Sequence, residues 1–246
     1  MRYFQDARRR FRFALSNPGY AVRAVLRDLT LADERFLAAV TASTPQAIRR
    51  LVEEPWQDEK FAAQLKQAEG IFRRFHLSSA EVYAKKVLIQ YAAIRAVAPG
   101  IVVETGVANG VSSAHLLLAL ARNNKGHLHS IEIGDASLLP PGSANGWVVP
   151  EWLRDRWTLR IGDAKTLLPE VLRGLGTIDV FIHDSLHTYD HMLWEYRAAY
   201  DHIRPGGLLI SDDALWNSAF SEFAATVGAR HAQILRGVGV LRKEIP

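Results

Sequence analysis

The chain has 246 residues, of which 48% are hydrophobic and 23% are charged, with a formal net charge of +4 and no cysteine. This is enough for one α/β domain with an appendage, and the lack of cysteine excludes disulfides, iron–sulfur clusters and cysteine nucleophiles. The mild charge gives no ground for expecting nucleic acid as a partner. We expect a cytoplasmic protein, because no apolar run reaches the ~20 residues of a transmembrane segment and the N-terminus lacks the apolar part of a signal peptide.

Residues 1–76 show no strand pattern and are predicted to form an N-terminal helical region. Its expected helices lie at 2–15, 20–29, 32–42, 45–53 and 57–69. The first 28 residues carry Arg2, Arg8, Arg9, Arg10, Arg12, Arg23 and Arg27 against only Asp6 and Asp28. Three roles stay open for this basic region. It could form a helical cap that packs on the sheet or joins a homo-oligomer, a layer that grips an anionic group of a ligand, or a helix on a membrane surface.

Residues 77–246 are predicted to form the ligand-binding domain. Ser78 and Glu81 make a capping box that opens a helix, and Pro99-Gly100 ends it. Strands and helices then alternate to about Phe223, as in a doubly wound, mostly parallel sheet. A hairpin around Gly237 is expected at the end. Residues 134–156 form a long insertion, and a loop of that length is usually functional or disordered.

The run from Ile101 to Glu104, followed by Gly106 and Gly110, predicts a buried strand, a tight turn and a helix. Glycine lets backbone N–H groups approach a ligand closely. The carboxylate of Glu104 disfavours a diphosphate and favours a cationic or amine-bearing ligand. A nicotinamide or flavin site is also disfavoured, because Ala108 and Val111 replace glycines of that motif.

Each of the next four predicted strands also ends in an acid. Glu132 ends the second strand, at the place where a ribose diol is usually held. The acids after the third, fourth and fifth strands are Asp163, Asp184 and the pair Asp212-Asp213. Because ligands bind outside the carboxyl ends of parallel strands, the sequence predicts a site at this edge.

Residues 79–243 resemble the class I S-adenosylmethionine-dependent methyltransferases. The resemblance is carried by Glu104-Thr-Gly-Val-Ala-Asn-Gly110, Glu132, Gly162-Asp163-Ala164 and Arg204-Pro-Gly-Gly207. One departure is Ala108, which replaces the middle glycine of the commoner loop. The resemblance implies an α/β, Rossmann-like fold with a doubly wound, mostly parallel seven-stranded sheet, and an enzyme that uses S-adenosyl-L-methionine.

The resemblance also implies roles for the residues of the cofactor site. Glu104 would lie near the methionyl amino group, Glu132 on the ribose hydroxyls and Asp163 near the adenine amine. The implied cofactor-binding residues are Glu104, Gly106, Gly110, Ser112, Glu132, Asp163, Ala164 and Asp184.

Within that family, the chain is most similar to metal-dependent O-methyltransferases related to catechol and macrolide-sugar methyltransferases. Asp184 is followed three residues later by His187, and Asp212-Asp213 comes 28 residues after Asp184. The resemblance implies that Asp184, Asp212 and Asp213 hold Mg²⁺ and that His187 is the catalytic base. Clustered carboxylates independently suit Mg²⁺ or Mn²⁺.

Other interpretations of these residues stay open. Asp213 could instead cap the next helix while Asp212 faces water. His191, expected on one helix face with His187, is an alternative base. So is His183, although it is expected to point to the opposite side of its strand.

The predicted function is divalent-metal-assisted O-methylation of a hydroxyl on a small molecule, such as a sugar or vicinal diol of a natural product or glycan. A catechol or other polyphenol also fits, and Trp147, Trp152 and Trp216 are candidates to stack on it, or simply core residues. One alternative is a non-haem iron hydroxylase with Asp184, His187 and His191 as its triad, which leaves Asp212 and Asp213 without a role. Another is a non-catalytic binding protein of the same fold.

Overall fold

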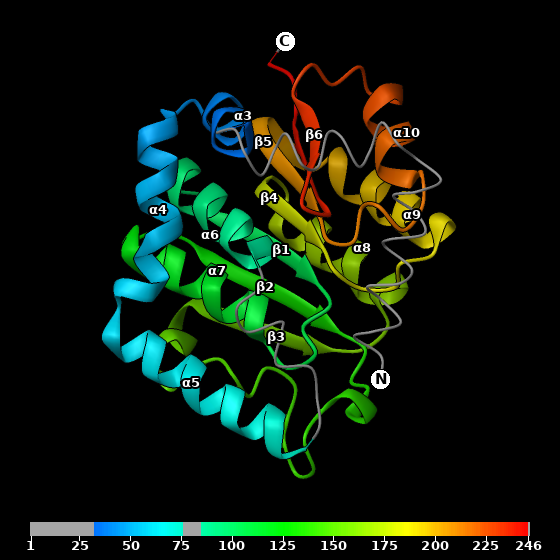
Figure 1. The fold of residues 1–246 in the computed structure, drawn as a ribbon. Helices are drawn as coiled ribbons and strands as arrows, with labels where there is room; N and C mark the ends of the chain where they lie inside the picture. The colour runs from blue at the N-terminus through cyan, green and yellow to red at the C-terminus, as the bar shows by residue number, and fades with distance from the viewer. Residues whose placement is uncertain (1–31, 76–84, 246) are drawn as a thin grey trace, which may run out of the picture.

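The computed structural model describes residues 32–75 and 85–245 (Figure 1). The first two expected helices, the basic segment with its three open roles and the capping box at Ser78 all lie outside the described residues. So does the predicted boundary between residues 76 and 77. The division into 1–76 and 77–246, and a homo-oligomer formed through the N-terminal helices, therefore stay predictions.

The described chain is built around a seven-stranded sheet in the order β3-β2-β1-β4-β5-β7-β6. Strands β1 to β5 pair in parallel, while β7 is antiparallel to both β5 and β6. The strands are β1 (Ile101–Thr105), β2 (His127–Glu132), β3 (Trp157–Ile161), β4 (Ile178–His183), β5 (Ile203–Ser211), β6 (Ala232–Leu235) and β7 (Val238–Arg242). The strand order reverses between β1 and β4, the point at which doubly wound sheets bind ligands. The predicted fold and the terminal hairpin are confirmed.

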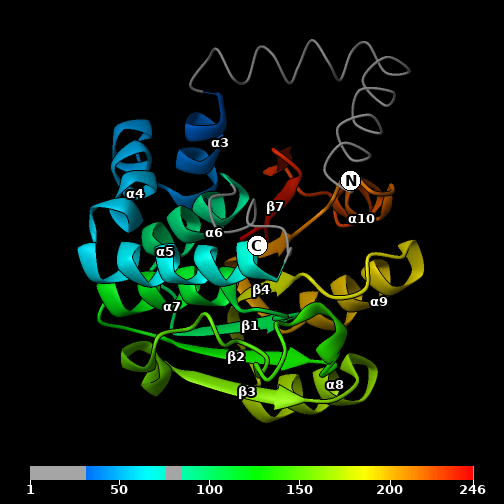
Figure 2. The same cartoon turned by 60° about the horizontal axis from the view of Figure 1, so that its bottom comes forward.

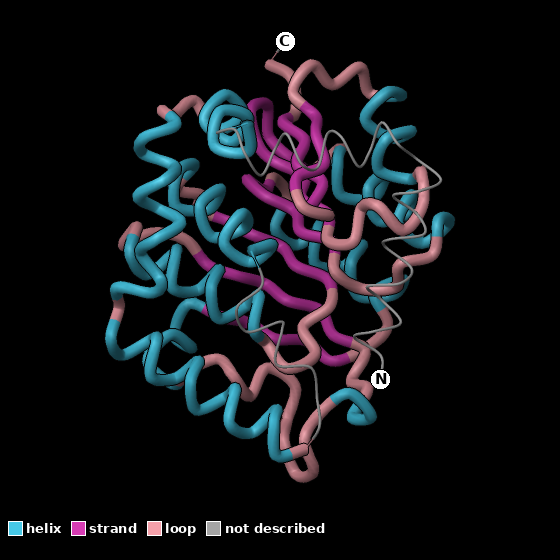
Figure 3. The backbone as a smooth tube through the Cα atoms, in the orientation of Figure 1, coloured by secondary structure: helices cyan, strands magenta, loops and turns pink. Residues whose placement is uncertain are grey.

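Helices cover both faces of the sheet (Figures 1 and 3). One face packs against α6 (Lys85–Val97) and α7 (Val111–Arg122), and the other against α8 (Ala164–Leu175), α9 (Tyr189–Tyr200) and α10 (Ala219–Thr226). Burial on both faces explains the continuous apolar runs of the central strands. Val180, Phe181 and Ile182 of β4 are all fully buried.

The N-terminal helices α3 (Ala32–Thr41), α4 (Pro45–Gln57) and α5 (Glu59–Arg74) lie outside α6 and α7 (Figure 2). Their buried side chains, including Phe61 and Phe72, belong to the same apolar cluster as those of α6 and α7. A bidentate ion pair joins Arg95 of α6 to Glu54 of α4, with Nε 2.7 Å from Oε2 and Nη2 3.0 Å from Oε1. The helical region therefore shares a core with the sheet.

The boundaries expected for α4 and α5 differ from the structure, in which α5 ends at Arg74 and not at residue 69. Helix α4 was expected to end at residue 53, but it continues through Pro55 to Gln57. The next helix begins at Glu59 because the Asp58 carboxylate accepts a hydrogen bond from the backbone N–H of Phe61 at 3.0 Å. Among the described helices, none has the length and apolarity that a bilayer crossing requires.

The insertion at 134–156 is ordered and contains two short 3₁₀ helices, η2 (Ala136–Leu138) and η3 (Glu151–Arg156). It pairs with the loop after β1: the Gly146 N–H donates to the Ala108 carbonyl at 2.8 Å, and the Val148 N–H donates to the Asn109 carbonyl at 3.0 Å. The insertion thus fixes one wall of the region described next.

Candidate active site

A cavity of about 870 Å³ opens at the carboxyl ends of the central strands. Its walls come from the loop after β1, the end of β2, the start of α8, the loop after β4 and the end of β5. Two of the predicted site residues, Glu104 and His187, do not line this cavity. The predicted site residues that line it are Gly106, Gly110, Ser112, Glu132, Asp163, Ala164, Asp184, Asp212 and Asp213. Five strand connections thus contribute to one cavity at the switch point of the sheet.

The two glycines of the loop after β1 are required by the contacts of the chain itself. Gly106 and Gly110 have φ angles of 85° and 86°, which side chains rarely adopt. A Cβ on Gly106 would lie 2.0 Å from the carbonyl oxygen of Asp184, and one on Gly110 would lie 2.6 Å from the Cα of Gly146. Ala108 also has a positive φ, 46°, where the commoner motif has glycine.

Glu132 holds this loop in place from the end of β2. One carboxylate oxygen accepts hydrogen bonds from the N–H groups of Val107 at 2.7 Å and Ala108 at 2.8 Å, and the other accepts from Gly134 at 3.0 Å. The side chain is 6% exposed and lines the cavity. Because each carboxylate oxygen has two lone pairs, Glu132 can also accept from a ligand hydroxyl.

Glu104 lies beneath the cavity, fully buried. Its carboxylate accepts from the hydroxyls of Ser113 and Ser130 at 2.7 Å and of Ser112 at 3.2 Å. Burial raises the pKa of Glu104 to about 7, although the three hydroxyls oppose that rise. Ser112 lines the cavity, so its hydroxyl lies between Glu104 and the space above.

Asp163 caps helix α8. Its carboxylate accepts from the Lys165 N–H at 2.9 Å, and Ala164 is the first residue of the helix. Both residues lie across the cavity from the ends of β4 and β5, in the part of the wall that also contains Glu132.

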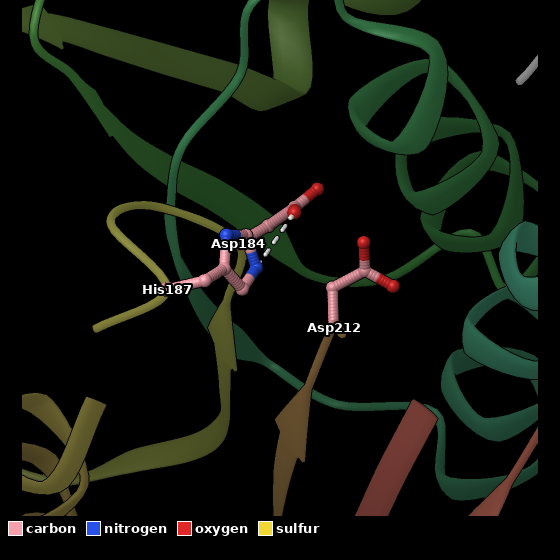
Figure 4. Close-up of side chains that lie close together, drawn as sticks. All are labelled: Asp184, His187 and Asp212. Carbon is pink, nitrogen blue, oxygen red and sulfur yellow. Dashed lines mark ion pairs between the residues drawn. The ribbon is translucent and has the colours of Figure 1, made fainter. Parts of the chain in front are cut away.

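Asp184 and Asp212 line the opposite part of the cavity, and they form a cluster with the imidazole of His187, which lies beside them without lining the cavity. One ligand atom from each of Asp184, His187 and Asp212 lies within 4.8 Å of the other two. Figure 4 shows Asp184 and His187 in the segment after β4, with Asp212 beside them after the end of β5. His187 Nε2 lies 3.7 Å from Asp184 Oδ1.

The electrostatics of this cluster favour a cation. Burial and the neighbouring charge of Asp212 raise the pKa of Asp184 well above its usual range, and Lys86 only partly opposes this. Burial, helped by His183, lowers the pKa of His187 to about 4, so its imidazole is neutral near pH 7. Asp212 is 1% exposed, and its Oδ1 is buried without a hydrogen-bond partner. An unpaired buried acceptor beside a second acid fits a hard divalent ion.

Asp213 lines the same cavity but is not part of this cluster. Its φ angle is 45°, and the next helix begins only at Ala219. The alternative in which Asp213 caps the following helix while Asp212 faces water is therefore wrong.

The iron triad of the alternative interpretation, with Asp184, His187 and His191, is not assembled. His191 Nε2 lies 2.9 Å from Glu195 Oε1 and 3.2 Å from Ser185 Oγ, so it is held by other partners. The expectation that His187 and His191 share a helix face is also wrong, because α9 begins at Tyr189, after His187.

Two residues of this region were not identified from the sequence. Glu195 is fully buried and accepts from His183 and His191, and Lys86 pairs with Asp212. The spacing of four between His191 and Glu195 on a helix was a usable signal for the first. No local signal pointed to Lys86, which is 126 residues from its partner in sequence.

Of the three tryptophans considered for acceptor stacking, only Trp216 lies beside the cluster. Its ring centroid is 5.3 Å from that of His187, and the residue is 61% exposed. Trp147 packs against Phe72, and its indole N–H donates to Asn109 at 2.7 Å. Trp152 lies against Lys60 and does not line the cavity.

Residues 103–214 match the family model described as a methyltransferase domain. No curated protein matches the chain. Among solved structures, the chain is similar to the O-methyltransferase TomG from Streptomyces achromogenes, with 20% identity and a TM-score of 0.57. TomG is involved in tomaymycin synthesis, and its structure was solved with SAM. That match covers 74% of this chain and 90% of TomG. The O-methyltransferase from Bacillus cereus, solved with SAH, is 15% identical with a TM-score of 0.56. That match covers 80% of this chain and 100% of the Bacillus cereus chain. At these identities the likeness is one of fold.

Proposed function

Residues 103–214 match a methyltransferase domain. We propose that the chain is a class I S-adenosylmethionine-dependent methyltransferase that methylates a hydroxyl oxygen of a small molecule with the help of a divalent ion. The observation that carries this proposal is the single cavity with two chemically different halves. One half is formed by the loop after β1, Glu132 and Asp163, and the other by Asp184, Asp212 and Asp213. A methyl donor in the first half would face an acceptor in the second.

The first half suits S-adenosylmethionine. Glu132 can accept from the ribose hydroxyls, and Asp163 at the start of α8 can accept from the adenine amine. Gly106 and Gly110 hold the loop against Asp184 and Gly146, which leaves its backbone facing the cavity. We assign the methionyl amino group to Ser112 and Asp184, with Glu104 acting from beneath through the Ser112 hydroxyl.

The second half suits Mg²⁺ or Mn²⁺. Asp184 and Asp212 would hold the ion, because these ions prefer oxygen ligands, and Asp213 would add a third negative charge to the cavity wall. When bound, the ion would supply a Lewis acid that lowers the pKa of an acceptor hydroxyl.

His187 is the proposed base. It is neutral near pH 7 and can accept the hydroxyl proton at Nε2, which has no hydrogen-bond partner. The acceptor oxygen then attacks the methyl carbon in line as the carbon–sulfur bond breaks, giving the methyl ether and S-adenosylhomocysteine. The residues contribute mainly by positioning and electrostatics.

A vicinal diol is the proposed acceptor, since two adjacent oxygens can approach an ion held on one side by the two carboxylates. The exposed Trp216 beside His187 offers an apolar surface to the ring that carries the diol. A sugar or polyphenol meets both requirements. A binding-only role would give no function to the cluster of Asp184, His187 and Asp212.

The test uses S-adenosylmethionine with an isotopically labelled methyl group and a panel of sugars, polyols and catechols. We expect label in an acceptor oxygen with Mg²⁺ or Mn²⁺ and none after chelation by EDTA. Asp212→Asn should abolish transfer while S-adenosylhomocysteine still binds, because Asp212 is assigned to the ion and not to the methionyl amino group. Full turnover in excess EDTA would contradict the role of the ion, and label recovered on nitrogen or carbon would contradict oxygen as the acceptor.

A further inference from the structure

The ammonium of Lys86 lies inside the acidic cluster. Lys86 is near the start of α6, and its Nζ is 2.5 Å from Asp212 Oδ2. The lysine side chain is 32% exposed, whereas that of Asp212 is 2% exposed. The ammonium of Lys86, on α6, therefore contacts Asp212, a carboxylate that we assign as a ligand of the divalent ion.

The contact of Lys86 is with one oxygen of Asp212 only. The other oxygen, Oδ1, is buried without a hydrogen-bond partner, and so is His187 Nε2. Burial alone would lower the pKa of Lys86, but Asp212, Asp184 and Asp213 outweigh this effect and raise it. Through its contact with Asp212, the Lys86 ammonium neutralises part of the negative charge beside it, while Asp212 Oδ1 and His187 Nε2 remain without hydrogen-bond partners.

We propose that Lys86 is a resident counter-ion that competes with the divalent ion for Asp212 and so sets the ion affinity of the site. The inference rests on the ion site of the proposed function. Two cations cannot both lie against one buried carboxylate without strong repulsion, so an entering ion displaces the ammonium from Asp212. The displaced ammonium stays at the wall of the cavity, which Lys86 lines.

The direct test measures Mn²⁺ binding by the electron paramagnetic resonance signal of the free ion. Lys86→Met should bind Mn²⁺ roughly tenfold or more tightly than the wild type, because the repulsion is gone. Lys86→Arg keeps the charge and should stay close to the wild type. The matched control is Lys165→Met, which removes a lysine from the same cavity wall but outside the acidic cluster and should leave Mn²⁺ affinity unchanged.

Two results separate this inference from the function it rests on. Equal Mn²⁺ affinity in the wild type and in Lys86→Met would overturn the competition and leave the ion site standing. No binding by either protein, with S-adenosylhomocysteine still bound, would overturn both the competition and the ion site. Binding by Lys86→Met alone would support the inference.

A second measurement needs no variant of Lys86 and stays decisive if Lys86→Met does not fold. The wild type is acylated with an amine reagent in saturating Mg²⁺ or in EDTA, and the modified lysines are quantified by peptide mass spectrometry. Displacement by the ion should raise the acylation rate of Lys86 several-fold relative to that of Lys165. A Lys86 rate that is unchanged or lower in Mg²⁺ would overturn the proposal.

Discussion

His183 Nδ1 lies 2.6 Å from Glu195 Oε2, and both side chains are completely buried. The same carboxylate accepts from Thr105 Oγ1 at 2.6 Å, Ser185 Oγ at 2.8 Å and His191 Nε2 at 2.9 Å. Burial would raise the pKa of Glu195, but the hydrogen bonds from His183 and His191 lower it to about 2. This ionised carboxylate joins His183 at the end of β4 to His191 in α9, and the ring of His183 lies 5.1 Å from that of His187 in the acidic cluster.

We predict that Glu195→Gln destabilises the protein. The amide keeps only one acceptor oxygen and places an NH₂ group against donors, so buried donors lose their partner at a cost of about 1–3 kcal/mol. Urea unfolding followed by circular dichroism measures the change. Glu222→Gln is the control, because that exposed carboxylate accepts from Tyr189 at the surface, and its unfolding midpoint should not move. Equal midpoints for Glu195→Gln and the wild type would refute the structural role of the network.

Acid should destabilise the protein through His115. This histidine is fully buried in α7, and burial lowers its pKa to about 4 from 6.5. Because the unfolded state binds a proton more readily, the contribution of His115 is complete above about pH 6.5 and is lost as the pH falls from there toward 4. The free energy of unfolding should decline by up to ~1.4 kcal/mol per pH unit in that window.

The variant His115→Leu isolates this contribution, since leucine does not titrate. Denaturant unfolding from pH 7 to pH 4 should give a shallower decline for the variant than for the wild type. Parallel curves for the two proteins would show that His115 is not the group responsible.

Ala108→Gly should stabilise the protein or leave its stability unchanged. Alanine at a φ of 46° is strained by about 1–2 kcal/mol relative to glycine, and the greater freedom of glycine in the unfolded chain offsets about 0.4–1 kcal/mol of that gain. Thermal unfolding measures the difference. The control Ala119→Gly, in the interior of α7, should lower stability by about 1 kcal/mol. A comparable loss in both variants would mean that position 108 is not strained.

His187→Ala should reduce turnover by about 10²–10⁴-fold, the usual range for a general base. Mn²⁺ affinity should change little, because the ion is assigned to oxygen ligands. Asp212→Asn, in contrast, should weaken Mn²⁺ binding strongly, because Asp212 is an assigned ligand of the ion. The two measurements are initial rates with saturating ion and a Mn²⁺ titration. If ion affinity and turnover fall together in His187→Ala, then His187 is a ligand and not the base.

The doubly wound class of the sheet and the edge at which the site lies could be predicted from the sequence, because each of the first five strands is a short apolar run followed by an acid. The surroundings of those acids could not. Glu104 is enclosed by serines from α7 and β2, and Lys86 reaches Asp212 only after α6 packs beside the sheet. Contacts between residues so far apart in sequence depend on how the layers pack, which leaves no local pattern.

The glycines illustrate a second limit. Gly106 and Gly110 were correctly expected in a tight turn, but the atoms that exclude a side chain there belong to Asp184 and Gly146. Contacts within the folded chain therefore require glycine at positions 106 and 110, whether or not a ligand is bound. His187 shows the same limit, since the Asp-x-x-His spacing predicted a histidine beside the acids but not its position ahead of α9.

We expect the half of the cavity around Glu132 to bind S-adenosylmethionine. Isothermal titration calorimetry with S-adenosylhomocysteine tests it most directly, because neither the acceptor nor the ion is needed. We predict micromolar affinity, about −8 kcal/mol, weakened by about 1–3 kcal/mol in Glu132→Ala through the loss of hydrogen bonds to the ribose diol. Folded wild-type protein that binds neither S-adenosylhomocysteine nor S-adenosylmethionine would contradict the account.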